Sequence, residues 1–364
     1  MGYIVALLFV LLGLYKKESK CVSTAILLYI SILIGFNEGS ADYWVYETMY
    51  YNCFDPIFAT HEPGYMLLCK VFSSLGFSFV FFRTFLGMLM AALYYEAIRF
   101  FTQNVNFALA LLLVFPLCAA PSGLRNSLSG AIVLYAVHFL FEKKNCYLLK
   151  YFFTVLLATL FHYNSVFFFI LPVAAIRKFK FSTLLVTTLA VIPALVLVAK
   201  TNLPYLILSR ITSSEKVLHW FHFSFFFGKI YIFALALALV MIFLLYYSKK
   251  FLPKYPISGC TSQEDVITMS KIGALTLLSF SGAIFKSVVF LRYLITLMPL
   301  YYVFLSETLC SRKGDTVETV KVKRALRVFL PFFCAFLLWF VYGFWIGGDA
   351  IHNFQKNLLF SQLS

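Results

Sequence analysis

The amino-acid sequence predicts an all-α, polytopic membrane protein of about 10–12 transmembrane helices. Of its 364 residues, 62% are hydrophobic and only 12% are charged, whereas a soluble domain carries about 25% charged residues. Apolar runs of about 14–22 residues recur along the whole chain, close to the ~20 residues that a helix needs to cross a bilayer. We therefore expect residues 1–364 to form a single integral-membrane domain.

Each apolar run is interpreted as one helix. The first run, 2–15, has no basic leader and no small-residue cleavage site, which favours a membrane helix over a removed signal peptide. A shorter apolar piece, 63–75, follows a Pro-Gly turn, and we expect it to lie at the membrane surface or to be re-entrant. The remaining predicted spans are 21–36, 77–99, 105–120, 123–141, 147–161, 164–176, 181–199, 228–247, 271–290, 293–307 and 327–346.

The distribution of Lys and Arg predicts the topology. Positive charges gather in alternate loops, beginning with "YKKESK" at 15–20. Because cytoplasmic loops carry an excess of Lys and Arg, we place the loops 142–147, 248–270 and 308–326 inside and both termini outside. The opposite loops are poor in lysine and hold the unusual polar residues, so the candidate chemistry gathers on the outer face.

Charge and cysteine content exclude two other classes of function. The formal net charge is +15, but the positive residues lie in short loops between apolar runs, as expected when they set topology. We therefore expect no nucleic-acid partner. The eight cysteines are scattered without a C-x-x-C pair, which favours small buried side chains over a disulfide framework or a metal site.

Arg125 opens the span 123–141 in "PSGLRNSLSGAI", and Asn126 extends the polar patch beside it. An ionisable residue in a span costs roughly 2.5–3.5 kcal/mol on insertion scales, so it normally faces a cavity or a partner. A planar guanidinium with five donors suits a phosphate or diphosphate. The alternative is an interfacial arginine that reaches lipid phosphate.

Three further ionisable residues are candidates. His162 separates two apolar runs in "LFHYNS", where it is either a base or donor to a sugar or phosphate oxygen, or a hydrogen-bonded histidine at a helix break. Lys286 and Arg292 lie six residues apart near one membrane boundary. Two such cations repel unless an anion lies near them, so Arg292 is a second candidate phosphate ligand. The long side chain of Lys286 can instead reach the interface.

Other polar residues favour structural roles. Arg83 and Glu96 lie near opposite ends of the span 77–99, and Arg99 follows Glu96 by three residues. His219 and His222 are spaced to bind a metal from one helix face, but two ligands are too few to specify zinc. Packing at the membrane surface is the favoured interpretation of these histidines.

The outer segment between the second and third spans combines carboxylates with aromatic residues. Glu62 precedes a Pro-Gly turn, so we expect it at a helix N-terminus, where a carboxylate is electrostatically favoured. It either caps that helix or orients or deprotonates a sugar hydroxyl. Asp42 lies at the start of the same segment. The aromatic residues stack on sugars or form an interfacial belt; they are Tyr43, Trp44, Tyr46, Tyr50 and Tyr51.

Motifs for nucleotide or metal chemistry are missing from the sequence. It contains no G-x-x-x-x-G-K-[ST], G-x-G-x-x-G, H-E-x-x-H or D-x-D. We therefore expect no metal and no cofactor in the active site.

The order of several short motifs resembles the EpsG-like family of Wzy-type polysaccharide polymerases. These motifs are "DY", "EPGYMLL", "FFR", "GLRNSLSGAI", "LFHYNS" and "FLRY", and they extend from Asp42 to about Tyr302. Such enzymes are similar in layout to the helical, GT-C-like glycosyltransferases that use lipid-linked donors, including O-antigen ligases.

The resemblance implies a metal-independent glycosyltransferase of the bacterial inner membrane, with its active site facing the periplasm or cell exterior. It would polymerise undecaprenyl-diphosphate-linked repeat units into O-antigen, capsule or exopolysaccharide. The implied partners are the lipid-linked donor and acceptor glycans, membrane lipid, a chain-length regulator and a flippase. Two alternatives remain open: an O-antigen ligase, and a flippase for lipid-linked oligosaccharides.

The roles expected of the candidates follow from this resemblance. Arg125 and Arg292 hold the donor diphosphate, and His162 orients or activates the reacting groups. Glu62 positions or deprotonates the acceptor. Further candidates for sugar contacts are Asp42, Lys286 and Asn126.

Overall fold

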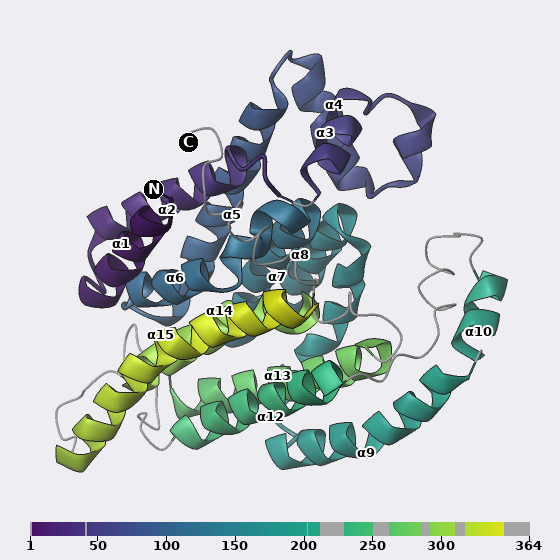
Figure 1. The fold of residues 1–364 in the computed structure, drawn as a ribbon. Helices are drawn as coiled ribbons and strands as arrows, with labels where there is room; N and C mark the ends of the chain where they lie inside the picture. The colour runs from purple at the N-terminus through teal and green to yellow at the C-terminus, as the bar shows by residue number, and fades with distance from the viewer. Residues whose placement is uncertain are drawn as a thin grey trace. The chain divides into compact units, whose positions relative to one another are not determined.

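The computed structural model describes residues 2–40, 42–201, 203–211, 229–249, 262–284, 292–309 and 317–345. Every regular element within these ranges is a helix (Figure 1), so the prediction of an all-α chain is confirmed. The chain divides into two compact units, each described by itself below. Unit 1 comprises Met1–Val166, Pro256–Thr261 and Thr296–Ser364, and unit 2 comprises Phe167–Tyr255 and Ser262–Ile295. The expectation of one integral-membrane domain stays a prediction.

Unit 1 contains two helices that pack closely through small residues, α2 (Lys20–Gly35) and α5 (Phe79–Phe101). A Cβ atom on Gly35 would lie 3.0 Å from Cα of Thr84, and one on Gly87 would lie 3.0 Å from Cα of Ser31. Small residues let two helix backbones approach in this way. Further α-helices in the first stretch of this unit are α1 (Gly2–Tyr15), α6 (Val105–Val114), α7 (Leu124–Glu142) and α8 (Tyr147–Phe161).

The segment between α2 and α5, which the sequence predicts to lie outside, folds into three short helices: α3 (Tyr43–Tyr51), the 3₁₀ helix η1 (Pro56–Thr60) and α4 (Pro63–Ser74). Arg83 of α5 anchors the start of this segment. Its Nη1 donates to the carbonyl oxygen of Asn37 at 2.7 Å, and its guanidinium lies 4.9 Å from the ring centre of Tyr43. Arg83 is only 1% exposed, which fits the structural role that the sequence favours.

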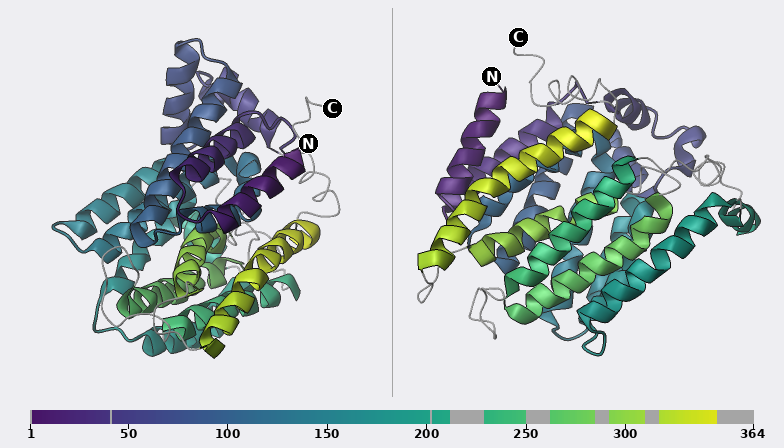
Figure 2. Two further views of the ribbon diagram at one scale, coloured as in Figure 1. Left: turned by 90° about the vertical axis from the view of Figure 1, so that its left-hand side faces the viewer. Right: turned by 60° about the horizontal axis from the view of Figure 1, so that its bottom comes forward.

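Unit 2 is built around α13 (Gln263–Ile284), which packs against both α9 (Phe181–Lys200) and α12 (Lys229–Ser248) (Figure 2). Oγ1 of Thr188 in α9 donates to the carbonyl oxygen of Ala274 in α13 at 3.3 Å. The short helix α10 (Leu203–Ile211) follows α9. Two elements cross the division between the units: the 3₁₀ helix η3 (Tyr163–Ala175) and α14 (Arg292–Leu309).

Most predicted spans coincide with observed helices, but three boundaries are wrong. The helix predicted over 105–120 ends at Val114, because Phe115 precedes Pro116 and is extended, and the 3₁₀ helix η2 (Leu117–Gly123) follows. Helix α13 begins at Gln263 rather than 271, and α15 (Val317–Trp345) begins ten residues before the predicted 327. In both, a polar first part continues the helix beyond the apolar run.

Two described helices, α5 and α7, are long and apolar enough by length and composition to cross a membrane. Several described helices of 10–17 residues are also apolar. This pattern fits a helical membrane protein. The number of spans stays a prediction.

Candidate active site

Glu62 lies at the N-cap of α4, and Pro63 begins the helix. Its carboxylate makes no capping hydrogen bond, so capping of α4 is not its role. The residue is only 3% exposed. A carboxylate at this depth requires partners of its own, and two come from other helices.

A close contact between α4 and α8 brings the first partner into reach. A Cβ atom on Gly64 would lie 2.9 Å from the carbonyl oxygen of Leu160. Glu62 lies two residues before Gly64, and His162 lies two residues after Leu160. The direct backbone contact therefore sets the start of α4 against the end of α8 and aligns the two side chains.

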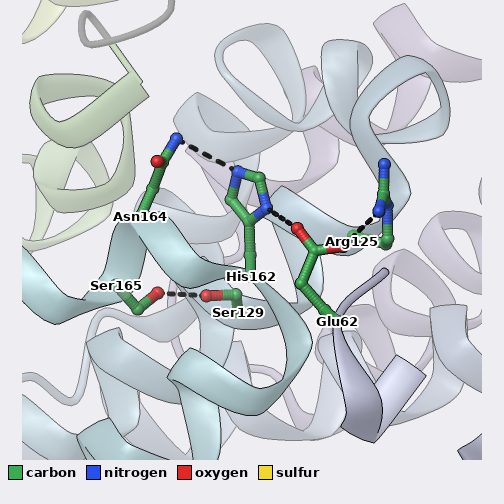
Figure 3. Close-up of polar contacts among 6 residues, drawn as sticks. All are labelled: Glu62, Arg125, Ser129, His162, Asn164 and Ser165. Carbon is green, nitrogen blue, oxygen red and sulfur yellow. Dashed lines mark hydrogen bonds and ion pairs between the residues drawn. The ribbon is translucent and has the colours of Figure 1, made fainter. Parts of the chain in front are cut away.

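His162 is the first partner. It is the C-cap of α8, has an extended backbone and is 8% exposed. Its Nδ1 lies 3.0 Å from Oε1 of Glu62, and its Nε2 lies 3.2 Å from Nδ2 of Asn164 (Figure 3). With the amide of Asn164 donating to Nε2, the ring proton is on Nδ1, which donates to Glu62.

Arg125 is the second partner. It lies in the first turn of α7, and its Nη1 forms an ion pair with Oε2 of Glu62 (Figure 3). The guanidinium carbon lies 5.5 Å from the ring centre of Tyr46 and 5.8 Å from that of Tyr65, within the range of a cation–π contact. The two oxygens of Glu62 therefore bind side chains of different helices. Oε1 contacts the residue at the end of α8, and Oε2 contacts the residue at the start of α7.

These partners determine the charge of Glu62, which lies outside the predicted spans. Burial by itself raises the pKa of the carboxyl group, but the hydrogen bond from His162 and the charge of Arg125 outweigh it. The pKa falls from 4.5 to about 2. Glu62 is therefore ionised at neutral pH and is a weak acceptor of protons.

A second polar contact fixes the chain just after His162. The hydroxyl groups of Ser129 in α7 and Ser165 in η3 are hydrogen-bonded (Figure 3). The backbone N–H of Ser165 donates to the carbonyl oxygen of His162 at 3.0 Å. The turn that carries His162 and Asn164 is thereby tied to α7, the helix that carries Arg125.

A sequence model of the EpsG family matches residues 20–352 of the chain. The chain belongs to the EpsG family. Membership of this family indicates a role in polysaccharide biosynthesis at a membrane. A search of curated proteins and a search of solved structures each found no significant match.

Three residues of the motifs that resemble the EpsG family meet in one site: Glu62 of "EPGY", Arg125 of "GLRNS" and His162 of "LFHYNS". The sequence analysis predicted Asn126 as a sugar contact but did not predict a role for Asn164, although Asn164 lies two residues after His162. The dense polar run "HYNS" at a helix break is the signal that points to it.

The remaining candidates of this EpsG-family chain are distributed elsewhere. Asp42 precedes α3, and Asn126 follows Arg125 in α7. Arg292 begins α14, but its side chain lies outside the described part of the structure, as does the whole of Lys286 and of His219 and His222. The predicted roles of Asp42, Asn126, Arg292 and Lys286 stay predictions.

The aromatic residues of α3 divide into two groups. Tyr43, Tyr46 and Tyr50 are buried, and Tyr46 lies beside Arg125. Trp44 is 72% exposed and Tyr51 is 57% exposed. Only the second group is open to a sugar or to lipid, so the five residues do not form one stacking surface.

Proposed function

We propose that this chain is a polymerase that joins lipid-diphosphate-linked oligosaccharide repeat units at the outer face of the inner membrane. The observation that carries the proposal is the contact of the buried Glu62 and His162 with the partly buried Arg125 in a chain of the EpsG family. The group combines a cation suited to a diphosphate with a histidine oriented by a carboxylate. In this proposal undecaprenyl diphosphate is the lipid carrier, and the chain shares the helical layout of enzymes that use lipid-linked donors.

The proposed reaction is a single displacement at the anomeric carbon of the donor. The acceptor hydroxyl oxygen forms a bond to that carbon while the bond from the carbon to the diphosphate oxygen breaks. The lipid diphosphate leaves with the electron pair, and the hydroxyl proton passes to the protein. The energy arrives with the donor, so the step requires no nucleotide.

His162 is the favoured base in this reaction. The pKa of Glu62 is about 2, and both of its oxygens are already engaged, which makes it a poor proton acceptor. His162 can take the proton on Nε2 once the amide of Asn164 gives way to the acceptor hydroxyl. Glu62 then stabilises the positive charge that forms on the ring, as a carboxylate does beside a catalytic histidine.

Arg125 is the proposed electrophilic group. As the diphosphate leaves, negative charge develops on its oxygens, and a preorganised guanidinium offsets that charge in place of a metal ion. The tyrosine rings beside Arg125 hold the guanidinium before substrate arrives, which avoids reorganisation during the reaction.

An elongation assay with purified protein tests the proposal directly. Lipid-linked repeat units are mixed with the protein in liposomes containing excess chelator, and products are separated by size. We expect a ladder with the wild type and none with His162→Ala at the same protein level. A strict requirement for added divalent metal would contradict the proposed role of Arg125.

A deletion strain separates the polymerase from the two alternatives. Loss of the polymer ladder, with single repeat units still on the surface, is expected for a polymerase. Complete loss of surface glycan would point instead to a ligase or a flippase. Complementation with the wild type but not with His162→Ala ties the result to the candidate site.

A further inference from the structure

The anion that Arg125 holds in this structure is the carboxylate of Glu62. A carboxylate and a phosphate offer the same arrangement of acceptors to a guanidinium. We propose that the Glu62 carboxylate occupies the subsite of one donor phosphate, and that donor binding transfers Arg125 from Glu62 to that phosphate. This inference rests on the proposed function and adds an order of events to it.

The hydrogen bonding of Arg125 is incomplete with Glu62 as its anion. Its Nη1 reaches Oε2, but its Nε is buried and makes no hydrogen bond. In this arrangement Glu62 supplies no acceptor to Nε, and its other oxygen, Oε1, is hydrogen-bonded to Nδ1 of His162. A diphosphate carries more oxygens than one shared carboxylate, so it can satisfy both sides of the guanidinium fork. Buried donors without partners call for such an explanation.

The surroundings of Arg125 favour movement of the anion over movement of the cation. Tyr46 and Tyr65 both lie within 6 Å of the guanidinium carbon, and their own rings meet edge to face at 5.9 Å. Both tyrosines are buried. The guanidinium therefore stays in place while one acceptor replaces another, and Glu62 keeps its contact with His162.

The exchange would couple donor binding to activation of the base. While Arg125 neutralises Glu62, the carboxylate stabilises the protonated ring of His162 less. When the phosphate replaces Glu62 at Arg125, the full negative charge of Glu62 acts on Nδ1 of His162. Nε2 then becomes a stronger proton acceptor only after the donor is bound. This order protects the site from accepting a proton before the donor is present.

Glu62→Gln separates this inference from a simple catalytic role. The amide cannot compete for Arg125 as an anion, so we expect the variant to bind undecaprenyl diphosphate on the order of tenfold more tightly than the wild type. The same variant should lose elongation activity. Binding is measured with purified protein in nanodiscs, with undecaprenyl monophosphate as the comparison ligand.

Glu47→Gln is the matched control. It removes the same charge from α3, where the Glu47 carboxylate accepts from the hydroxyl of Tyr43 at 3.2 Å. We expect its affinity for the diphosphate to equal that of the wild type. Arg125→Ala should abolish tight binding in both the wild-type and the Glu62→Gln chains.

The outcomes distinguish the exchange from the proposed function. Unchanged or weaker binding by a folded Glu62→Gln variant would overturn the exchange, even if the wild type elongates glycan. Failure of the wild type to elongate lipid-linked units would overturn the polymerase instead. If Glu62→Gln does not fold, Glu62→Asp replaces it. The shorter side chain loosens the ion pair, so tighter binding is again expected, and unchanged binding contradicts the exchange.

Discussion

At Glu62 the two carboxylate oxygens bind side chains that lie 63 and 100 residues further along the chain. The sequence predicted each of Glu62, Arg125 and His162 as a candidate, because a charged or polar side chain is costly beside apolar spans. It could not predict that Glu62 pairs with Arg125, since that contact depends on how α4, α7 and α8 pack. It also left open which residue is the base.

Replacement of Arg125 tests the fork geometry of its side chain. Arg125→Lys keeps the charge but loses paired hydrogen bonds, each worth roughly 1.5–3 kcal/mol when charge-assisted. We expect at least about a tenfold loss of elongation, and Arg125→Ala should remove the detectable ladder. Ladder intensity is compared with the amount of protein in the membrane fraction.

Two results would contradict this role of Arg125. Full activity of both variants would exclude it from the site. A loss of activity that matches a loss of protein would make Arg125 structural, as expected of an interfacial arginine that lysine can replace.

The pKa of Glu62 predicts a pH dependence of stability. Because the folded-state pKa is lowered from 4.5 to about 2, the ionised group stabilises the fold fully above pH 4.5. This contribution is lost as the pH falls from 4.5 towards 2. It amounts to at most on the order of 3 kcal/mol.

Thermal unfolding in detergent measures this contribution. The Tm difference between the wild type and Glu62→Gln should be constant above about pH 5 and narrow steadily below pH 4.5. A difference that stays constant down to pH 3 would show that the folded carboxyl titrates as in the unfolded chain.

At the scale of the elements, hydrophobic runs located the helices well but not all their ends. Pro116 ends α6 within what reads as one apolar run, because the residue before a proline is driven out of the helical region. Hydropathy also overlooks the charged first turns of α13, where Glu264 and Asp265 lie. Neither feature changes the site, since α4, α7 and α8 begin within a residue of their predicted starts.

The contact of α4 with α8 makes Gly64 a positioning residue. A methyl group there would meet the backbone of Leu160 at 2.9 Å, and a backbone cannot be moved aside as a side chain can. Gly64→Ala should therefore separate Glu62 from His162 and lower elongation by about 10²-fold, the loss that a misplacement of about 1 Å can cause.

Gly123→Ala is the control for Gly64→Ala. A Cβ atom on Gly123 meets only Cβ of Asn126, at 3.9 Å, so near-normal activity is expected. The elongation rate of each variant is divided by its folded amount, measured by size-exclusion chromatography. Equal rates for the two variants would show that the close contact does not position Glu62.

At the scale of the whole molecule, two sets of polar contacts in unit 1 join helix ends that the predicted topology assigns to one face. Asn106 at the start of α6 donates to the carbonyl oxygens of Lys16 and Ser19, in the turn between α1 and α2. Thr102, which follows α5, is hydrogen-bonded to Glu307 near the end of α14. The predicted topology places all of these ends inside.

The candidate site joins the opposite set of ends. Glu62 lies in the predicted outer segment, Arg125 opens the span 123–141, and His162 ends the span 147–161. Alternation of the spans is consistent with this meeting, because the start of α7 and the end of α8 lie on the same face when the two helices form a hairpin. The sequence predicted this grouping from loop charge alone. The assignment of one face as cytoplasmic rests on the Lys and Arg distribution, and a separate experiment tests it.

Cysteine labelling decides the orientation. Val45→Cys lies in α3, where the native side chain is 55% exposed, and Asp315→Cys lies in the predicted inner loop 308–326. Each is introduced into a chain whose eight native cysteines are replaced. In spheroplasts, we expect a membrane-impermeant maleimide to label position 45 and to reach position 315 only after lysis. Because lysis must expose both positions in a folded chain, it serves as the control. Labelling of 315 but not 45 in intact spheroplasts would show that the true topology is the inverse of the predicted one. The candidate site would then lie at the cytoplasmic face, where flipped lipid-linked units cannot reach it.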